Sequence, residues 1–210
     1  MSISLLGANE IRELASSLDL RPTKKLGQNF VIDSNVCQKI ARLARVESGD
    51  NVVEIGPGIG SLTLALLERG ATVVAIEVDP RLANKLPKTL TNHGGEKFQV
   101  LTDDALAVTS LPISANKLVA NLPYNISVPV LLHFLESFPE IRSGIVMVQS
   151  EVAERLAAKP GKKDYGAPSA KAAWWAKVEL SDSVSRKVFW PVPNVDSSLV
   201  AFQRVEPIDR

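Results

Sequence analysis

The fold is decided by the stretch Val52-Val53-Glu54-Ile55-Gly56-Pro57-Gly58-Ile59-Gly60. Its apolar, β-branched start predicts a buried strand, and the pattern from Ser61 to Arg69 predicts a helix. Between them stand three glycines at alternate positions. Glycine permits positive φ and carries no Cβ, so such a turn leaves its backbone open to a flat ligand. A strand–glycine turn–helix unit at the carboxyl edge of a parallel sheet suits a nucleotide-like ligand and indicates an α/β domain.

The spacing of these glycines separates two classes of cofactor. A dinucleotide-binding turn requires G-x-G-x-x-G, but Ser61 stands three residues after Gly58, which disfavours a nicotinamide oxidoreductase. Glu54 followed by G-x-G-x-G resembles the first motif of the class I S-adenosylmethionine (SAM) methyltransferases, whose cofactor has a sulfonium and an amino-acid tail but no phosphate. These nine residues alone are also compatible with a plain strand-to-helix connection.

Length and composition fit one large α/β domain. The chain has 210 residues, of which 45% are hydrophobic. It contains no run of eighteen apolar residues, and Glu10, Arg12 and Glu13 interrupt the amino terminus where a signal peptide would be apolar. We therefore expect a cytoplasmic protein that does not enter a membrane. The single cysteine, Cys37, excludes an intrachain disulfide and is expected to be a buried small hydrophobe.

Periodicity predicts further elements on either side of the glycine turn. An amphipathic helix is expected over residues 8–18, and a second helix is capped by Asp33 or Ser34, which gives a helical extension over about 1–49. A later helix begins at Pro80, and Pro87 is expected to end or kink it. The strands are expected at residues 52–55, 71–76, 98–101, 117–120 and 199–205.

Two carboxylates at predicted strand ends suit a nucleoside. Glu77 ends the second strand, 21 residues after Gly56, where a carboxylate can accept hydrogen bonds from both ribose hydroxyls. Asp103 and Asp104 follow the third strand, where a carboxylate can accept from the exocyclic amine of adenine. We assign Asp104 to the cofactor and expect the other aspartate to cap a turn.

A more specific resemblance begins where the fourth strand ends. The motif Asn121-Leu122-Pro123-Tyr124 is similar to that of the small-subunit rRNA adenine N6,N6-dimethyltransferases, the dimethyladenosine transferase family. Further matches follow the order of that family along most of the chain. They are Leu26-Gly27-Gln28-Asn29-Phe30, Glu54-Ile55-Gly56-Pro57-Gly58, Glu77-Val78-Asp79-Pro80, Asp104-Ala105-Leu106, Tyr165-Gly166 and Phe189-Trp190-Pro191-Val192-Pro193-Asn194-Val195-Asp196-Ser197.

The resemblance implies a fold, a cofactor and a substrate. The fold is the Rossmann-like class I SAM-dependent methyltransferase fold, with a seven-stranded, mostly parallel sheet and helices on both faces. The substrate is adenine N6 in small-subunit rRNA within a pre-30S particle, and the enzyme is expected to be a monomer. The resemblance places SAM against Gln28, Asn29, Val31, Glu54, Gly56, Gly58, Glu77, Val78, Asp104, Ala105 and Asn121.

Some positions depart from the family pattern. Val31 stands where leucine is common, and Pro168 and Ala173 replace a usual leucine and glutamine near Trp174-Trp175, which we expect in a strand. Family members also continue into a small helical domain, whereas this chain stops at Arg210. We therefore expect residues 1–210 to be the methyltransferase domain without that helical domain.

The chemistry follows from the weak nucleophilicity of adenine N6, whose lone pair is delocalised into the ring. The Asn121 side-chain oxygen and the Leu122 carbonyl can accept from the N6 hydrogens and turn the lone pair toward the methyl group. Pro123 makes the turn rigid and carries no N–H. Tyr124 and Phe189 are expected to stack on the two faces of a flipped base. No metal and no general base are required.

The basic residues are candidates for rRNA contacts, although the net charge is only +1. A solvated surface explains these charges equally well. The candidates are Lys24, Lys25, Lys159, Lys162, Lys163, Arg186 and Lys187.

Two other functions compatible with the motifs stay open. The large-subunit rRNA dimethyltransferases of macrolide resistance share the fold and the N-[LI]-P-[YF] motif. An RNA-binding assembly or transcription factor could keep the fold without turnover, although intact Asn121 and Tyr124 argue against lost chemistry.

Overall fold

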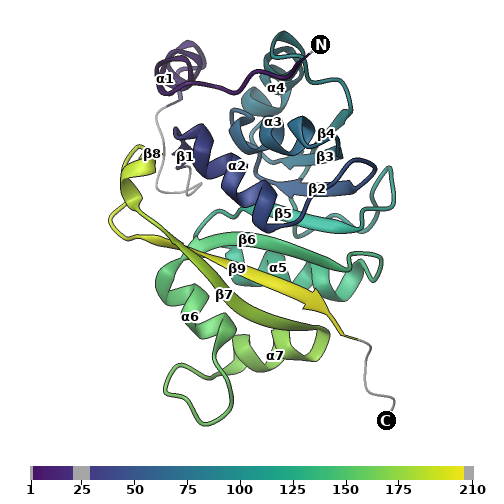
Figure 1. The fold of residues 1–210 in the computed structure, drawn as a ribbon, viewed down its shortest axis with the longest axis vertical. Coiled ribbons are helices and arrows are strands. Elements are labelled where there is room, and N and C mark those ends of the chain that lie inside the picture. The colour runs from purple at the N-terminus through teal and green to yellow at the C-terminus, as the bar shows by residue number, and fades with distance from the viewer. Residues whose placement is uncertain (1, 21–28, 206–210) are drawn as a thin grey trace.

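The computed structural model describes residues 2–20 and 29–205 and is built around one seven-stranded sheet (Figure 1). The strand order is β4-β3-β2-β5-β6-β9-β7, and β9 runs antiparallel to both of its neighbours, β6 and β7, while the other pairs are parallel. The strands are β2 (Asn51–Ile55), β3 (Thr72–Glu77), β4 (Phe98–Thr102), β5 (Lys117–Asn121), β6 (Ser143–Gln149), β7 (Ala176–Val184) and β9 (Ser197–Arg204). This arrangement confirms the predicted α/β, mostly parallel sheet.

Helices cover both faces of the sheet. They are α1 (Ala8–Ser17), α2 (Ser34–Leu43), α3 (Ser61–Glu68), α4 (Pro80–Asn92), α5 (Ser127–Ser137), α6 (Ser150–Ala157), α7 (Ala167–Trp175) and the 3₁₀ turn η1 (Arg186–Val188). One apolar cluster joins the sheet to α1, α2, α3 and α4, and a second joins it to α5, α6 and α7. A separate two-stranded ribbon pairs β1 (Phe30–Val31) with β8 (Phe189–Trp190) in antiparallel register.

The five predicted strands agree with the structure to within two residues, since each is a short apolar run bounded by turn residues. Asp33 caps α2, because its carboxylate accepts from the Asn35 N–H at 2.9 Å. Of the two effects expected of Pro87, an end of the helix was wrong, because α4 continues to Asn92. The apolar face of α4, which includes the buried Leu86, packs in the core and holds the helix beyond the proline.

The tryptophan pair is also placed differently from the prediction. Trp174 and Trp175 end α7 and are not in a strand; β7 begins only at Ala176. The alanine-rich sequence from Ala167 favours a helix, and Pro168 occupies its first turn, where a missing N–H has no cost. Trp174 is 47% exposed, so it lies at the surface and not in the core.

The amino-terminal segment is attached to the sheet domain through His93, at the end of α4. His93 Nε2 lies 2.8 Å from Glu10 Oε1, and His93 Nδ1 lies 2.9 Å from Ser4 Oγ. His133, which belongs to α5, forms a hydrogen bond with the Val108 carbonyl at 2.8 Å. Both histidines thus have structural partners. Within the described residues, no helix is both long and apolar enough to cross a bilayer.

Candidate functional site

A cavity of about 240 Å³ opens at the carboxyl ends of the central strands. It lies where the chain order changes direction, because β2 is flanked by β3 on one side and by β5 on the other. Its walls come from β1, from the β2–α3 turn and from the ends of β3, β4 and β5. Among the predicted site residues, those that line it are Asn29, Val31, Glu54, Gly56, Gly58, Glu77, Val78, Asp104, Ala105, Asn121, Leu122, Pro123 and Tyr124.

The glycine turn forms the floor of this cavity. Gly56, Gly58 and Gly60 have φ of +67°, +57° and +100°, a region that residues with a Cβ rarely adopt. A Cβ on Gly58 would lie 3.0 Å from the Phe30 ring, and one on Gly60 would lie 2.7 Å from Leu86 Cδ1. The glycines therefore allow both the turn and the close packing beneath it.

Glu77 is held at the cavity wall by two backbone donors. Its Oε2 accepts from Gly58 N at 3.1 Å and its Oε1 accepts from Asp79 N at 2.9 Å. The side chain is only 4% exposed, and this burial raises the pKa of Glu77 above its ordinary value. A carboxylate has about four acceptor positions, so both oxygens can accept a further hydroxyl donor.

Glu54 is a buried carboxyl group near the end of β2, two residues before the glycine turn. It is 1% exposed, and its Oε2 has no hydrogen-bond partner among the described residues. Burial, and secondarily the negative charge of Glu77, raise the pKa of Glu54 to about 8. An unpaired buried oxygen beside an open cavity is the arrangement expected where a cationic ligand completes the site.

The opposite rim carries the two aspartates and two apolar side chains. Asp104 Oδ1 accepts from Leu106 N at 2.9 Å, and Asp103 Oδ1 accepts from Asp104 N at 2.8 Å. Both carboxylates thus stabilise the local turn, including the one that we assigned to the cofactor. Val78 and Leu106 are 53% and 39% exposed at this rim and offer an apolar slot for a flat ring.

Asn121, at the end of β5, lies on the side of the cavity away from β3 and β4. Its Nδ2 donates to the backbone carbonyl of Asn29 at 3.1 Å. Because a carbonyl only accepts, this bond fixes the orientation of the amide and leaves Oδ1 as the acceptor of the side chain. Pro123 packs against the turn, where a Cβ on Gly56 would lie 3.6 Å from its ring. Tyr124 is half-buried and hydrogen-bonded to Ser197 at 2.9 Å.

Phe189 occupies a different environment from the other predicted catalytic residues. Its ring is 1% exposed in the apolar cluster beneath the β1–β8 ribbon, and it is not among the residues that line the cavity. In this conformation it is not available for stacking on a base. Phe30 lines the cavity instead, with its ring 6.4 Å from that of Trp190 in a stacked geometry.

Comparisons with known proteins agree with this geometry. Residues 20–209 match the family described as ribosomal RNA adenine dimethylase. The chain belongs to this family. It is 58% identical to ribosomal RNA small subunit methyltransferase A of Leifsonia xyli, over 99% of this chain and 76% of that protein. It is 55% identical to the protein of the same name from Thermobifida fusca, over 95% of this chain and 71% of that protein.

Two solved structures are also similar. A dimethyladenosine transferase from Plasmodium falciparum superposes with a TM-score of 0.74 at 31% identity, over 82% of this chain and 62% of that chain. The 23S rRNA methyltransferase ErmE gives the same TM-score at 30% identity, over 86% of this chain and 72% of that chain. Membership of the rRNA adenine dimethylase family confirms the class I methyltransferase fold, SAM as the cofactor and rRNA adenine as the target.

The basic residues predicted to contact RNA are only partly described. Lys24, Lys25 and the cofactor candidate Gln28 lie outside the described residues. The lysines 159, 162 and 163 are exposed in the connection from α6 to α7. The Arg186 guanidinium donates to the Asn194 carbonyl at 2.8 Å, so it also supports the β8–β9 loop.

Sequence reasoning missed several groups that the structure brings to the site. Phe30, Leu106 and Asn125 line the cavity, and the Asn29 carbonyl orients Asn121. Phe30 and Leu106 stand inside recognised motifs, but no local pattern shows that they face the ligand.

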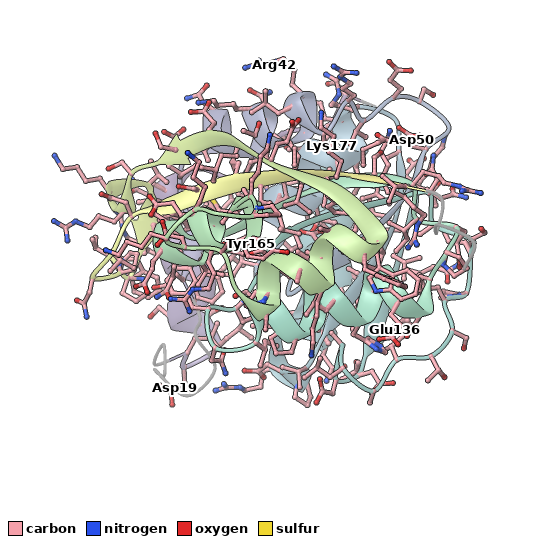
Figure 2. The ribbon with its side chains drawn as sticks, turned by 90° about the horizontal axis from the view of Figure 1, so that it is seen from below. Asp19, Arg42, Asp50, Glu136, Tyr165 and Lys177 are labelled. Carbon is pink, nitrogen blue, oxygen red and sulfur yellow. The ribbon has the colours of Figure 1, made fainter. Side chains whose placement is uncertain are left out.

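In the view of Figure 2, Arg42 of α2 lies on the same side of the molecule as Lys177 of β7 and opposite Glu136 of α5.

Proposed function

We propose that this chain transfers two methyl groups from SAM to N6 of adenine in small-subunit rRNA. The observation that carries the proposal is the amide of Asn121, held by the Asn29 carbonyl with its oxygen free to accept, at the rim of a cavity lined by Glu54 and Glu77. The relatives named for the small subunit, at 58% and 55% identity, favour this substrate over the large subunit.

The cavity residues fit the cofactor on chemical grounds. Glu54 offers an unpaired carboxylate oxygen for the amino group, and Glu77 offers acceptors for ribose hydroxyls. The open glycine backbone and the Val78–Leu106 slot suit the flat adenosine portion. Gln28, Val31, Asp104 and Ala105 complete the proposed binding set. When bound, SAM supplies an electrophilic methyl group.

The residues after β5 prepare the adenine amino group. Asn121 Oδ1 and the Leu122 carbonyl accept the two N6 hydrogens, which draws the nitrogen toward tetrahedral geometry and localises its lone pair. Tyr124 stacks on one face of the flipped base. The contribution of Phe189 requires its ring to leave the apolar cluster in which it is buried. The proton released from N6 passes to water.

The choice of asparagine over aspartate at position 121 has a structural reason. An aspartate at 121 would bring a carboxylate oxygen to the place of Nδ2, 3.1 Å from the Asn29 carbonyl oxygen. Two acceptors at that distance repel each other. Asn121 therefore serves both as a donor to the protein and as an acceptor for the substrate.

We propose residues 1–210 as one methyltransferase domain with an amino-terminal helical extension. Its partner is the small-subunit rRNA in a pre-30S particle, and the enzyme works in the cytoplasm as a monomer, where such particles assemble. The exposed lysines 159, 162 and 163, with Lys24, Lys25, Arg186 and Lys187, contact phosphates. Such contacts weaken as salt rises, because binding releases counterions from the RNA.

Particle specificity tests the proposal. Purified chain is incubated with labelled SAM and with small-subunit or large-subunit particles that lack adenine methylation, and rRNA nucleosides are analysed by mass spectrometry. We expect N6,N6-dimethyladenosine from small-subunit particles only. Product from large-subunit particles alone would assign the macrolide-resistance substrate. Binding of small-subunit particles without product, by a chain that SAM protects against thermal unfolding, would indicate an assembly factor.

A further inference from the structure

We infer that Ser197 is a positioning residue that holds the Tyr124 ring at the base-binding side of the cavity. Ser197 Oγ lies 2.9 Å from Tyr124 Oη, across 73 positions of sequence. The inference rests on the proposed function, in which Tyr124 stacks on adenine. Ser197 itself is fully buried and is not among the residues that line the cavity, so it acts only through Tyr124.

Tyr124 needs such an anchor because it stands in a turn. Its backbone carbonyl accepts from Ser127 Oγ at 3.4 Å, a long bond that restrains the main chain but not the ring. Tyr124 lines the cavity and is only half-buried. The hydroxyl stands at the far end of the ring. A fixed partner that binds it restrains both side-chain torsions of Tyr124 at once, and therefore restrains the ring more than a partner at any other atom.

Ser197 is well placed to be that fixed partner. It is the first residue of β9 and pairs with Gln149 of β6 on one side and with Val184 of β7 on the other. Its backbone is thus held within the sheet on both edges, and its side chain is 0% exposed. A hydroxyl in this setting has few alternative positions, so the bond transmits the rigidity of the sheet to the ring.

The electrostatics of the pair keep the bond intact at neutral pH. Burial, and secondarily the Asp196 carboxylate, raise the pKa of Tyr124 above its ordinary value, while the bond to Ser197 acts in the opposite direction. The phenol thus stays protonated at neutral pH and can donate to Ser197 or accept from it. When a flipped base stacks on a ring that is already held in place, less side-chain conformational entropy is lost on binding.

Four variants test the inference: Ser197→Ala, Tyr124→Phe, their combination and Ser197→Thr. Either single change removes the hydrogen bond and keeps a ring at position 124. We expect each to lower kcat/KM for rRNA methylation about fivefold, the size of one net hydrogen bond, with SAM affinity unchanged. Because both remove the same interaction, the double variant should be no slower than either single variant. Ser197→Thr, which keeps the hydroxyl, should retain most of the activity.

Ser198→Ala is the matched control. Ser198 is the next residue of β9 and also bonds a hydroxyl, Ser150 Oγ at 2.9 Å, but its side chain points to the other face of the sheet. The Ser198→Ala variant should methylate rRNA at the wild-type rate. Wild-type kcat/KM in Ser197→Ala, or losses that multiply in the double variant, would overturn the inference.

A second measurement needs no RNA and separates this inference from the proposed function. The chain has two tyrosines, Tyr124 and Tyr165, so ¹³C-labelled tyrosine rings give two resolvable sets of signals. We expect Ser197→Ala to shift the Tyr124 set and to leave Tyr165, which is 37% exposed, unchanged. Unshifted Tyr124 signals would refute the contact even if the wild type methylates rRNA. A wild type that does not methylate rRNA would refute the proposed function, while the ring signals still decide the contact.

Discussion

The half of the cavity proposed for the cofactor and the half proposed for the base differ in how closely their side chains already match the geometry that binding requires. On the cofactor side, Glu77 accepts two backbone donors and the glycine turn is packed against Phe30. On the base side, Asn121 and Tyr124 are each held by one side-chain hydrogen bond, but Phe189 is buried in the core. Only the first half could receive its ligand without rearrangement.

This difference has a physical basis. The cofactor half is formed largely by the ends of the parallel strands β2, β3 and β4, which are paired in continuous register over five positions. The base half joins the β5 loop to the short β1–β8 ribbon, which has only two paired positions. A site that must accept a base from a folded RNA gains from an element with few hydrogen bonds, because such an element opens at low cost.

Among the variants that test this difference, we expect Phe189→Ala to have the largest effect. Since the ring is 1% exposed, its removal leaves a cavity in the core and should lower the free energy of unfolding by about 3–5 kcal/mol, measured in urea. Phe189→Leu, which keeps most of the apolar volume, is the control and should recover most of this loss. If Phe189→Ala unfolded like the wild type and lost only methylation, the ring would belong to the base site and not to the core.

The pH dependence of stability tests the cofactor half next. The pKa of Glu54 is raised from 4.5 to about 8 in the folded state, so between these values the native protein holds a proton that the unfolded chain has lost. The free energy of unfolding should therefore fall as pH rises from about 5 to 8, with a slope of up to about 1.4 kcal/mol per pH unit. Above pH 8 both states are ionised and the fall should stop.

Glu54→Gln isolates this contribution, since the amide has the same shape and does not titrate. Its unfolding free energy should lack most of the decrease between pH 5 and 8, although the raised pKa of Glu77 leaves a smaller decrease of the same sign. SAM carries positive charge and favours the ionised carboxylate, so binding near pH 7 should release protons to the buffer in calorimetry. Identical pH profiles for both proteins would show that Glu54 is already ionised before the cofactor binds.

Asn121→Ala tests the base-side amide that the Asn29 carbonyl holds in place. Methyl transfer should fall by about 10²-fold or more, the effect of losing one oriented acceptor in the transition state, while SAM affinity stays near the wild-type value. Asn121→Asp should also fall, because the carboxylate repels the Asn29 carbonyl. Asn125→Ala, which removes an exposed amide at the same cavity, is the matched control. Normal turnover of Asn121→Ala would exclude it from the reaction.

The cofactor half was the more predictable from sequence, for the same reason that it is the more ordered. A β-branched run, glycines at fixed spacing and a carboxylate at the next strand end are local patterns, and β2, β3 and their turn follow them. The burial of Phe189 depends on the packing of a ribbon that joins residues about 160 positions apart, which no local pattern encodes.

The errors have the same origin. Pro87 opposes a helix locally, but the packing of Leu82, Leu86 and Leu90 outweighs it. The hydrogen bond from Asn121 to Asn29 spans 92 positions of sequence. Its acceptor is a backbone carbonyl, which every residue has, so the residue types at these positions do not reveal the bond. Groups that act through the main chain are visible only once the chain is folded.

Substitutions of Glu77 should have the smallest effects, and they distinguish a direct contact with the cofactor from support of the glycine turn. Besides the proposed ribose contact, the Glu77 carboxylate accepts hydrogen bonds from two backbone N–H groups of the protein itself. With alanine, the N–H groups of Gly58 and Asp79 lose their acceptor, so stability should fall by about 1–3 kcal/mol together with SAM affinity. Loss of SAM binding in this variant would therefore not identify a ribose contact.

Glu77→Gln separates the two tasks, because its amide keeps one oxygen for a backbone donor. We expect a smaller loss of stability and a SAM affinity about tenfold lower, about 1.4 kcal/mol, since a neutral amide with one oxygen cannot accept both ribose hydroxyls as a carboxylate does. Glu96→Gln, an exposed position with the same change of charge, is the control for net charge. If Glu77→Gln binds SAM like the wild type, the carboxylate acts only on the glycine turn, and the cofactor half would owe its affinity to Glu54 and the backbone.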